Sequence, residues 1–277
     1  MQIPLLYTIM FISSVYVWKQ IKRYFNLSAN AKLKTLSVAT SVLLMILNQR
    51  FLIGNCSSIV ECIHIKVDLN SILFPLICNT FLFLGPIYNQ IMDKVLIKEN
   101  SVNRFNQNQV FDDRMLIRIV LAPLLEEITF RALFYQNIED QSDFRLITSI
   151  LFSLAHSHKF FSFFKKERKY RSIYNNEANK FRDFKACFMK ALLTTLFILM
   201  FTFIFGFYAA TVFLKTRSLI SVILLHSYCN YLGFPKLKQI FSNTKINIIK
   251  SINQLYNLVV LVVYFVGIVF FYYFITM

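Results

Sequence analysis

The chain has 277 residues, of which 56% are hydrophobic and 17% aromatic, and its formal net charge is +16. A soluble domain of this length carries more charge and shorter apolar runs, so the composition excludes an ordinary soluble fold. It indicates an all-α, polytopic membrane bundle that forms a single domain over residues 1–277. The basic residues lie between the apolar segments, which argues against nucleic-acid binding and favours contact with anionic membrane lipid.

Apolar segments of span length recur along the chain and predict about eight transmembrane helices. Positive charge follows the first segment and does not precede it, which is the reverse of a secretory signal peptide, so we expect this segment to be retained. The predicted spans are residues 4–18, 35–54, 71–92, 115–135, 144–160, 186–214, 217–234 and 255–277.

The loops that connect these spans alternate in charge. Lysine and arginine gather in the first, third, fifth and seventh loops, above all in the basic segment 159–185. By the positive-inside rule these loops face the cytosol, and both termini face the lumen. We expect residues 159–185 to form a solvated cytosolic loop that sets the topology, with an interfacial helix as the alternative.

The five cysteines form neither a CxxC pair nor a zinc-ligand spacing. Cys78 and Cys229 lie in apolar segments and are expected to be packing residues. Cys56 and Cys62 can form a disulfide if their loop faces an oxidising lumen, but free thiols are at least as well supported.

Three charged side chains interrupt the apolar segment LAPLLEEITFRALFY, residues 121–135. A carboxylate in hydrocarbon costs about 2.5–3.5 kcal/mol on insertion scales, so two adjacent glutamates need a reason to be there. Glu127 and Arg131 are four residues apart and share a helical face, whereas Glu126 points about 100° away. We expect one carboxylate to pair with Arg131 and the other to act as a general base on water. A purely structural ion pair is the alternative.

Two further apolar segments carry histidines: His156 in ILFSLAHSH and His226 in VILLHSYCNY. His156 follows Phe152 by one turn and can relay the proton of the same water, while His158 lies at the polar edge on another face. His226 and Asn230 are four residues apart and can present two hydrogen-bond donors to a developing oxyanion. Hydrogen bonding between helices is the structural alternative for each of these residues.

A metal is the chemical alternative for the same side chains. One glutamate and two histidines can bind Zn²⁺, but the sequence has no HExxH or other compact ligand spacing. A metal site assembled from three separate spans is less favoured than direct glutamate chemistry. The sequence therefore predicts no metal and no cofactor.

Taken in order, EEITFR, FSLAH and HSYCN resemble the motifs EExxxR, FxxxH and HxxxN/D of the CAAX-protease and bacteriocin-processing (CPBP) family of intramembrane proteases. The longer strings SLAHSH and GFYAATVFLKTRSLISVILLHSYCNYLGFP resemble its eukaryotic branch, the Ras-converting CAAX endopeptidases. The resemblance covers residues 114–235. The chain departs from that branch at Lys159, where another histidine is common, and in the basic segment that follows.

The resemblance implies an enzyme of the endoplasmic reticulum membrane that cuts after the prenylated cysteine of a C-terminal CAAX sequence and releases the aaX tripeptide. The first glutamate would activate water with help from the histidine of the second motif, and the third motif would hold the oxyanion. The implied catalytic residues are Glu126, His156, His226 and Asn230, with Glu127 and Arg131 in support. The implied partners are farnesylated or geranylgeranylated CAAX proteins such as small GTPases. A protease for non-prenylated peptides, and a membrane transporter or non-catalytic scaffold, are the competing hypotheses.

Overall fold

The computed structural model describes residues 2–25, 31–54, 58–63, 68–88, 113–174 and 180–233, together with part of the segment 259–273. Within these ranges the chain is helical apart from short turns and contains no strand, which confirms the all-α prediction. The chain divides into two compact units. The first unit combines residues 1–66 with 124–219, and the second combines residues 67–123 with 220–277.

The described residues of both units form helices. η1, η2 and η3 are π-helices and η4 is a 3-10 helix. The helices of the first unit are α1 (Gln2–Phe25), α2 (Ala31–Leu47), η1 (Asn48–Ile53), α3 (Ile59–Cys62), α7 (Ala122–Glu127), η3 (Ile128–Leu133), α8 (Gln141–Ala155), η4 (His156–His158), α9 (Lys159–Tyr174) and α10 (Lys180–Thr216). Those of the second unit are α4 (Leu69–Leu82), α6 (Asp113–Leu116), η2 (Ile117–Leu121) and α11 (Leu219–Leu232). The unit boundaries fall inside α7 and α11, so α7 begins in the second unit and α11 begins in the first.

Two described helical stretches are long and apolar enough to cross a membrane: Leu33–Ile53, with a mean hydropathy of 1.6, and Phe184–Thr216, with 2.2. Shorter apolar helices cover Gln2–Val17, Leu69–Leu82 and Leu219–Leu232. Two more predicted spans are also helical. One of them coincides with α6, η2, α7 and η3, which follow one another without a break, and the other coincides with α8. Most of the last predicted span, 255–277, lies outside the described residues.

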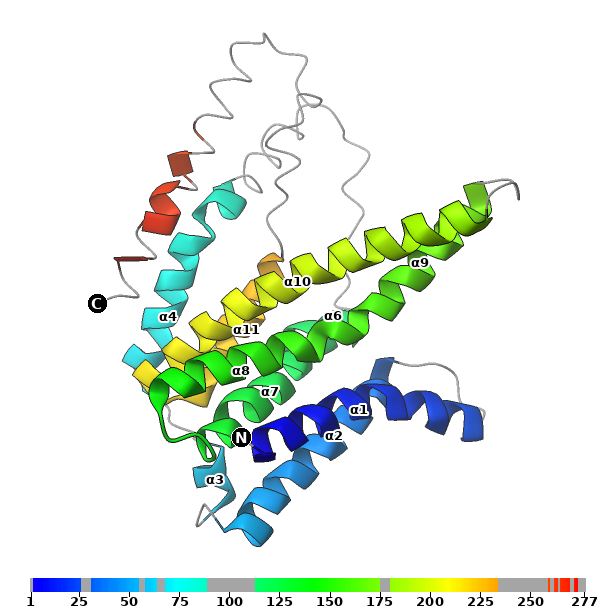
Figure 1. Ribbon diagram of the computed structural model, residues 1–277. Helices are drawn as coiled ribbons and strands as arrows, with labels where there is room; N and C mark the ends of the chain where they lie inside the picture. Colours follow the sequence, from blue (N-terminus) through cyan, green and yellow to red (C-terminus); the bar gives the residue numbers. More distant parts are fainter. Residues whose placement is uncertain are drawn as a thin grey trace. The chain divides into compact units, whose positions relative to one another are not determined.

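The basic segment 159–185 is helical over most of its length, where a loop was the favoured expectation. It forms α9 and the first turns of α10, which run side by side (Figure 1). Phenylalanines one turn apart on each helix supply the apolar contact. Phe160 lies 5.4 Å from Phe188, and Phe164 lies 5.4 Å from Phe184, between ring centroids. These aromatic positions are hard to recognise among the lysines of the sequence.

α8 packs closely along α10 through small residues. A Cβ placed on Gly206 of α10 would lie 3.1 Å from the Cα of Ser149 on α8, so the two backbones approach at this glycine. One turn further along α8, Ser153 donates to the backbone carbonyl of Leu199 at 2.6 Å. Small residues of this kind allow close contact between helices in membranes.

A buried polar network joins the α1–α2 pair to the end of η3. The Tyr7 hydroxyl of α1 donates to Oε1 of Gln49 at 3.1 Å. The Asn137 amide, just beyond η3, donates to the same oxygen at 3.1 Å. Gln49 is completely buried, so this network fixes the N-terminal pair against the segment that carries the charged residues.

The described cysteines include one that forms a disulfide and three that are free thiols. Cys62 is disulfide-bonded, and Cys56, with which it was considered as a pair, lies outside the described residues. Cys78, Cys187 and Cys229 are free thiols. The packing role expected for Cys78 is confirmed by its burial, whereas Cys229 is only partly buried.

Candidate active site

The two adjacent glutamates end α7, between the π-helices η2 and η3. A π-helical turn accommodates an extra residue and is frequent at functional sites. Glu127 is fully buried, whereas Glu126 is partly exposed. The two carboxylates therefore occupy different environments, as their rotation about the helix axis predicts.

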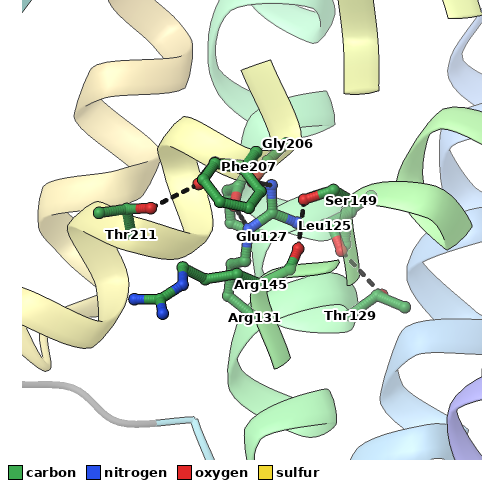
Figure 2. A network of polar contacts seen from close by, with 9 residues as sticks. All are labelled: Leu125, Glu127, Thr129, Arg131, Arg145, Ser149, Gly206, Phe207 and Thr211. Carbon is green, nitrogen blue, oxygen red and sulfur yellow. Dashed lines mark hydrogen bonds and ion pairs between the residues drawn. The ribbon is translucent and has the colours of Figure 1, made fainter. Parts of the chain in front are cut away.

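The Arg131 guanidinium has three partners, of which Figure 2 shows Glu127 and Gly206. Its Nε lies 3.3 Å from Oε2 of Glu127, and neither side chain is exposed. Its Nη2 donates to the backbone carbonyl of Gly206 on α10 at 3.4 Å. Its Cζ lies 5.0 Å from the ring centroid of Phe152 on α8, a cation–π contact. The predicted pairing of Glu127 with Arg131 is confirmed, and the guanidinium joins three helical segments.

Hydroxyl groups around this pair donate to carbonyls of their own helices. Thr129 donates to the Leu125 carbonyl at 2.9 Å, and Ser149 donates to the Arg145 carbonyl at 2.5 Å (Figure 2). Thr211 donates in the same way to Phe207 at 2.8 Å. Such bonds satisfy a hydroxyl in a low-dielectric interior without water.

His156 lies in the 3-10 turn that follows α8. Its Nδ1 is 2.9 Å from the backbone carbonyl of Phe152. Because a carbonyl only accepts, this nitrogen carries the proton, and the neutral ring then has its lone pair on Nε2. The ring centroids of His156 and Phe152 are 4.9 Å apart. Phe152 thus lies in contact with both His156 and the Arg131 guanidinium.

His158 lies closer to His156 than the sequence predicts. The expectation of different faces assumed an α-helix up to residue 160, but α8 ends at Ala155 and the turn that follows is tighter. The two histidine ring centroids are 6.4 Å apart. Nδ1 of His158 lies 2.7 Å from the Ala155 carbonyl, and its ring meets Tyr16 of α1 edge-on at 6.3 Å.

Lys159 is a residue to which sequence reasoning gave no role. It follows the 3-10 turn directly and is partly buried. Its ammonium interacts electrostatically with Glu126, as the Arg131 guanidinium also does. The signal in the sequence was a lysine at the edge of an apolar span, where a charge requires a partner.

His226 and Asn230 lie on α11, in the second unit. His226 is buried, and Asn230 is partly exposed. Nδ2 of Asn230 donates to the backbone carbonyl of Arg118 in η2 at 3.0 Å. An amide nitrogen carries two hydrogens, so this bond uses one of them. The structure therefore places Glu126, Glu127, Arg131 and His156 in the first unit, and His226 and Asn230 in the second.

The metal alternative requires a cluster of ligand side chains. Within the ranges that the structure describes, no group of three or more His, Cys, Asp or Glu side chains is arranged to hold a metal ion. The chelator arm of the experiment proposed below tests this alternative directly.

Comparison with known proteins covers the same part of the chain. Residues 114–232 match the family described as type II CAAX prenyl endopeptidase Rce1-like, and this segment contains all the predicted site residues. CAAX prenyl protease 2 of Homo sapiens is 28% identical over 250 residues, which cover 81% of this chain and 68% of the human protein. Probable CAAX prenyl protease 2 of Schizosaccharomyces pombe is 28% identical over 174 residues, 61% of this chain and 56% of the yeast protein.

CAAX prenyl protease 2 of Arabidopsis thaliana is 27% identical over 165 residues, which cover 58% of this chain and 44% of the plant protein. The chain therefore spans between about half and two thirds of the length of these relatives. No solved structure matches it. The family and the apolar helices indicate a membrane protein. The motif-bearing segment, residues 114–232, is therefore similar to the Rce1-like family of type II CAAX prenyl endopeptidases, and the relatives that the chain resembles carry the name CAAX prenyl protease 2.

Proposed function

We propose that this chain is an intramembrane endopeptidase that removes the aaX tripeptide from prenylated CAAX proteins with water activated by Glu126. The observation that carries the proposal is the division of labour between the two glutamates. Glu127 is engaged in the buried pair with Arg131, while Glu126 lies beside it with access to solvent. The family and the names of the relatives support the substrate class.

In the proposed reaction, Glu126 takes a proton from water as the water oxygen attacks the carbonyl carbon of the peptide bond after the prenylated cysteine. His156 assists at the same water and carries the proton toward the leaving amine. Its bond to the Phe152 carbonyl supports this role, because it leaves Nε2 as the basic nitrogen. His226 and Asn230 donate to the oxyanion, an assignment that rests on their spacing in the sequence.

We also propose that the chain crosses the endoplasmic reticulum membrane about eight times, with the basic loops in the cytosol. The disulfide at Cys62 supports a lumenal position for the second loop, since disulfides persist in oxidising compartments. A prenyl chain partitions into lipid with about 0.8 kcal/mol per buried CH₂, which holds the substrate cysteine at the membrane. Catalytic groups in the cytosolic half of the bilayer would meet it there.

The experiment is the release of the aaX tripeptide from a farnesylated CAAX peptide by membranes that contain this protein, followed by mass spectrometry. The same peptide without the prenyl group is the matched control. We expect release from the farnesylated peptide alone, unchanged by a strong zinc chelator.

Each other outcome favours a different hypothesis. Equal cleavage of the non-prenylated peptide would favour a protease of broader substrate range. Loss of cleavage in the presence of the chelator would favour a metal ion bound by Glu126, His156 and His226. Absence of any cleavage by protein shown to be folded would contradict the substrate class and favour a transporter or scaffold.

A further inference from the structure

Glu167, the single acidic residue of α9, contacts basic side chains of α9 and α10. Glu167 accepts a hydrogen bond from Nζ of Lys190 on α10 at 2.9 Å. It also lies 3.6 Å from Nε of Arg171, one turn further along α9. Its side chain is only 14% exposed. Glu167 therefore neutralises charge on the inner side of the pair and not on the side that faces away from α10.

The outer side of α9 carries a concentrated positive charge. At about 100° per residue, Lys165, Lys166 and Lys169 fall within an arc of about 100° on the side of the helix away from Glu167. All of them are exposed. We call this surface the basic face, and its residues are Lys165, Lys166, Arg168 and Lys169.

Exposed aromatic side chains flank the three lysines of the basic face on both sides. Phe161 is 59% exposed and Tyr170 is 57% exposed, although the inner phenylalanines of α9 are packed against α10. Lysines that reach phosphate groups, with aromatic rings at the boundary of headgroups and acyl chains, are typical of helices that contact a bilayer surface. A soluble acidic partner would require no exposed aromatic flank.

We propose that the basic face binds the headgroups of anionic phospholipids in the leaflet at which α8 ends. The inference goes beyond the proposed function and takes from it only the cytosolic side of residues 159–185. α9 begins at Lys159, directly after the turn that ends α8. Lys165 and Lys166 are therefore displaced from that end by about 10 Å along the axis. This distance is slightly longer than the screening length of about 8 Å in physiological salt, so the lysines interact with the headgroups by extending their side chains toward that end of α8.

Headgroup binding has a consequence for the candidate active site. α9 follows η4 without a break, and η4 carries His156 and His158. Lipid that holds α9 also restricts the turn from which His156 is presented.

The test uses the full chain in nanodiscs of phosphatidylcholine, with and without phosphatidylserine. Hydrogen exchange of the α9 amides, read by mass spectrometry, reports lipid binding without reference to peptidase activity. We expect phosphatidylserine to slow this exchange by about fivefold or more, since each basic residue near an anionic surface contributes about that factor. The slowing should disappear at high salt.

Two variants sharpen the test. Lys165→Gln/Lys169→Gln should lose the slowing, whereas Lys165→Arg/Lys169→Arg should keep it. The matched control Arg145→Gln/Lys215→Gln removes two positive charges near the start of α8 and the end of α10, and it should respond like the wild type.

Equal exchange in the two lipid compositions would overturn the proposal. The same slowing by soluble inositol hexakisphosphate in phosphatidylcholine discs would identify a soluble polyanion as the ligand and would also overturn it. Loss of the response in the control variant would show a general effect of net charge, which contradicts a specific face. None of these results depends on whether the chain cleaves prenylated peptides, so failure of the proposed function would be seen separately.

Discussion

The buried charge of Arg131 depends on Glu127, because both side chains are shielded from water. Removal of one partner from a buried pair leaves the other charge uncompensated, at a cost of about 3–5 kcal/mol. We expect Arg131→Leu to lower the free energy of unfolding by that amount, and Glu127→Leu/Arg131→Leu to recover part of the loss. Chemical denaturation in detergent micelles measures both.

Lys190→Gln is the control for this prediction. It removes a cation whose side chain is 62% exposed, and exposed pairs contribute less than about 1 kcal/mol. If Arg131→Leu lowered the free energy of unfolding no more than Lys190→Gln does, the buried pair would stabilise the fold no more than an exposed pair, which would contradict the prediction.

Lys159 supplies a positive charge to Glu126, the proposed base. Replacement of its charge should weaken catalysis while leaving the fold intact, since the residue lies at a helix boundary. We expect Lys159→Gln to lower kcat/KM by about tenfold, or about 1.4 kcal/mol, and Lys159→Arg to retain most of it. Steady-state cleavage of the prenylated peptide measures both variants. Equal kcat/KM values for Lys159→Gln and wild type would contradict a role for Lys159 in catalysis.

The contact between α8 and α10 depends on the absence of a side chain at Gly206. Its carbonyl also accepts from Arg131, so displacement of α10 disturbs the buried pair as well. We expect Gly206→Ala to cost about 1–3 kcal/mol, as overpacking does, and Gly206→Leu to cost more. Thermal unfolding measures the loss. Ile204→Ala is the control, because Ile204 is 58% exposed on the same helix, and an equal effect of both alanine variants would contradict the close approach.

The α9–α10 pair should weaken in acid. The hydrogen bond from Lys190 holds the pKa of the Glu167 carboxyl below its ordinary value of 4.5. A lowered pKa means that the ionised carboxylate stabilises the fold above the unfolded pKa, and that this contribution is lost as pH falls through the folded value. The Tm difference between wild type and Glu167→Gln should therefore be present at neutral pH and vanish in acid. A difference that persists at low pH, or one that Glu139→Gln reproduces, would contradict this.

Helix positions were predictable from hydropathy, but not every helix end was. The apolar runs that become α2, α10 and α11 are evident in the sequence. The end of α8 at Ala155 was not, because apolar and polar residues continue across the 3-10 turn without glycine or proline. The end of α10 was predicted at residue 214 and lies at Thr216, because the polar residues that follow mark the boundary. Arg217 takes the left-handed conformation there, with φ of 51°, that usually marks glycine.

Local spacing predicted the candidate site better than long-range contacts. The pairing of Glu127 with Arg131 follows from four residues of separation on one helix. The bond from Arg131 to Gly206 spans 75 residues, and that from Asn230 to Arg118 spans 112. Both acceptors are backbone carbonyls, which leave no trace in residue identity. Lys159 became visible as a neighbour of Glu126 only once the turn after α8 was known.

The whole chain combines a family segment that carries the motifs with flanking helices that support it. The motif segment, residues 114–232, covers the helices from α6 to α11. In the first unit, the α1–α2 pair is attached to this segment by Tyr7, Gln49 and Asn137. The N-terminal pair therefore contributes to the support of the charged helix, although it lies outside the matched segment.

The central claim is that Glu126 activates the water that cuts the substrate. The most direct measurement is kcat for the farnesylated CAAX peptide by Glu126→Gln, with an unchanged Tm as proof of folding. We expect a loss of about 10²–10⁴-fold, the usual contribution of a general base. A folded Glu126→Gln protein that cleaves the peptide within a fewfold of the wild-type rate would contradict the claim.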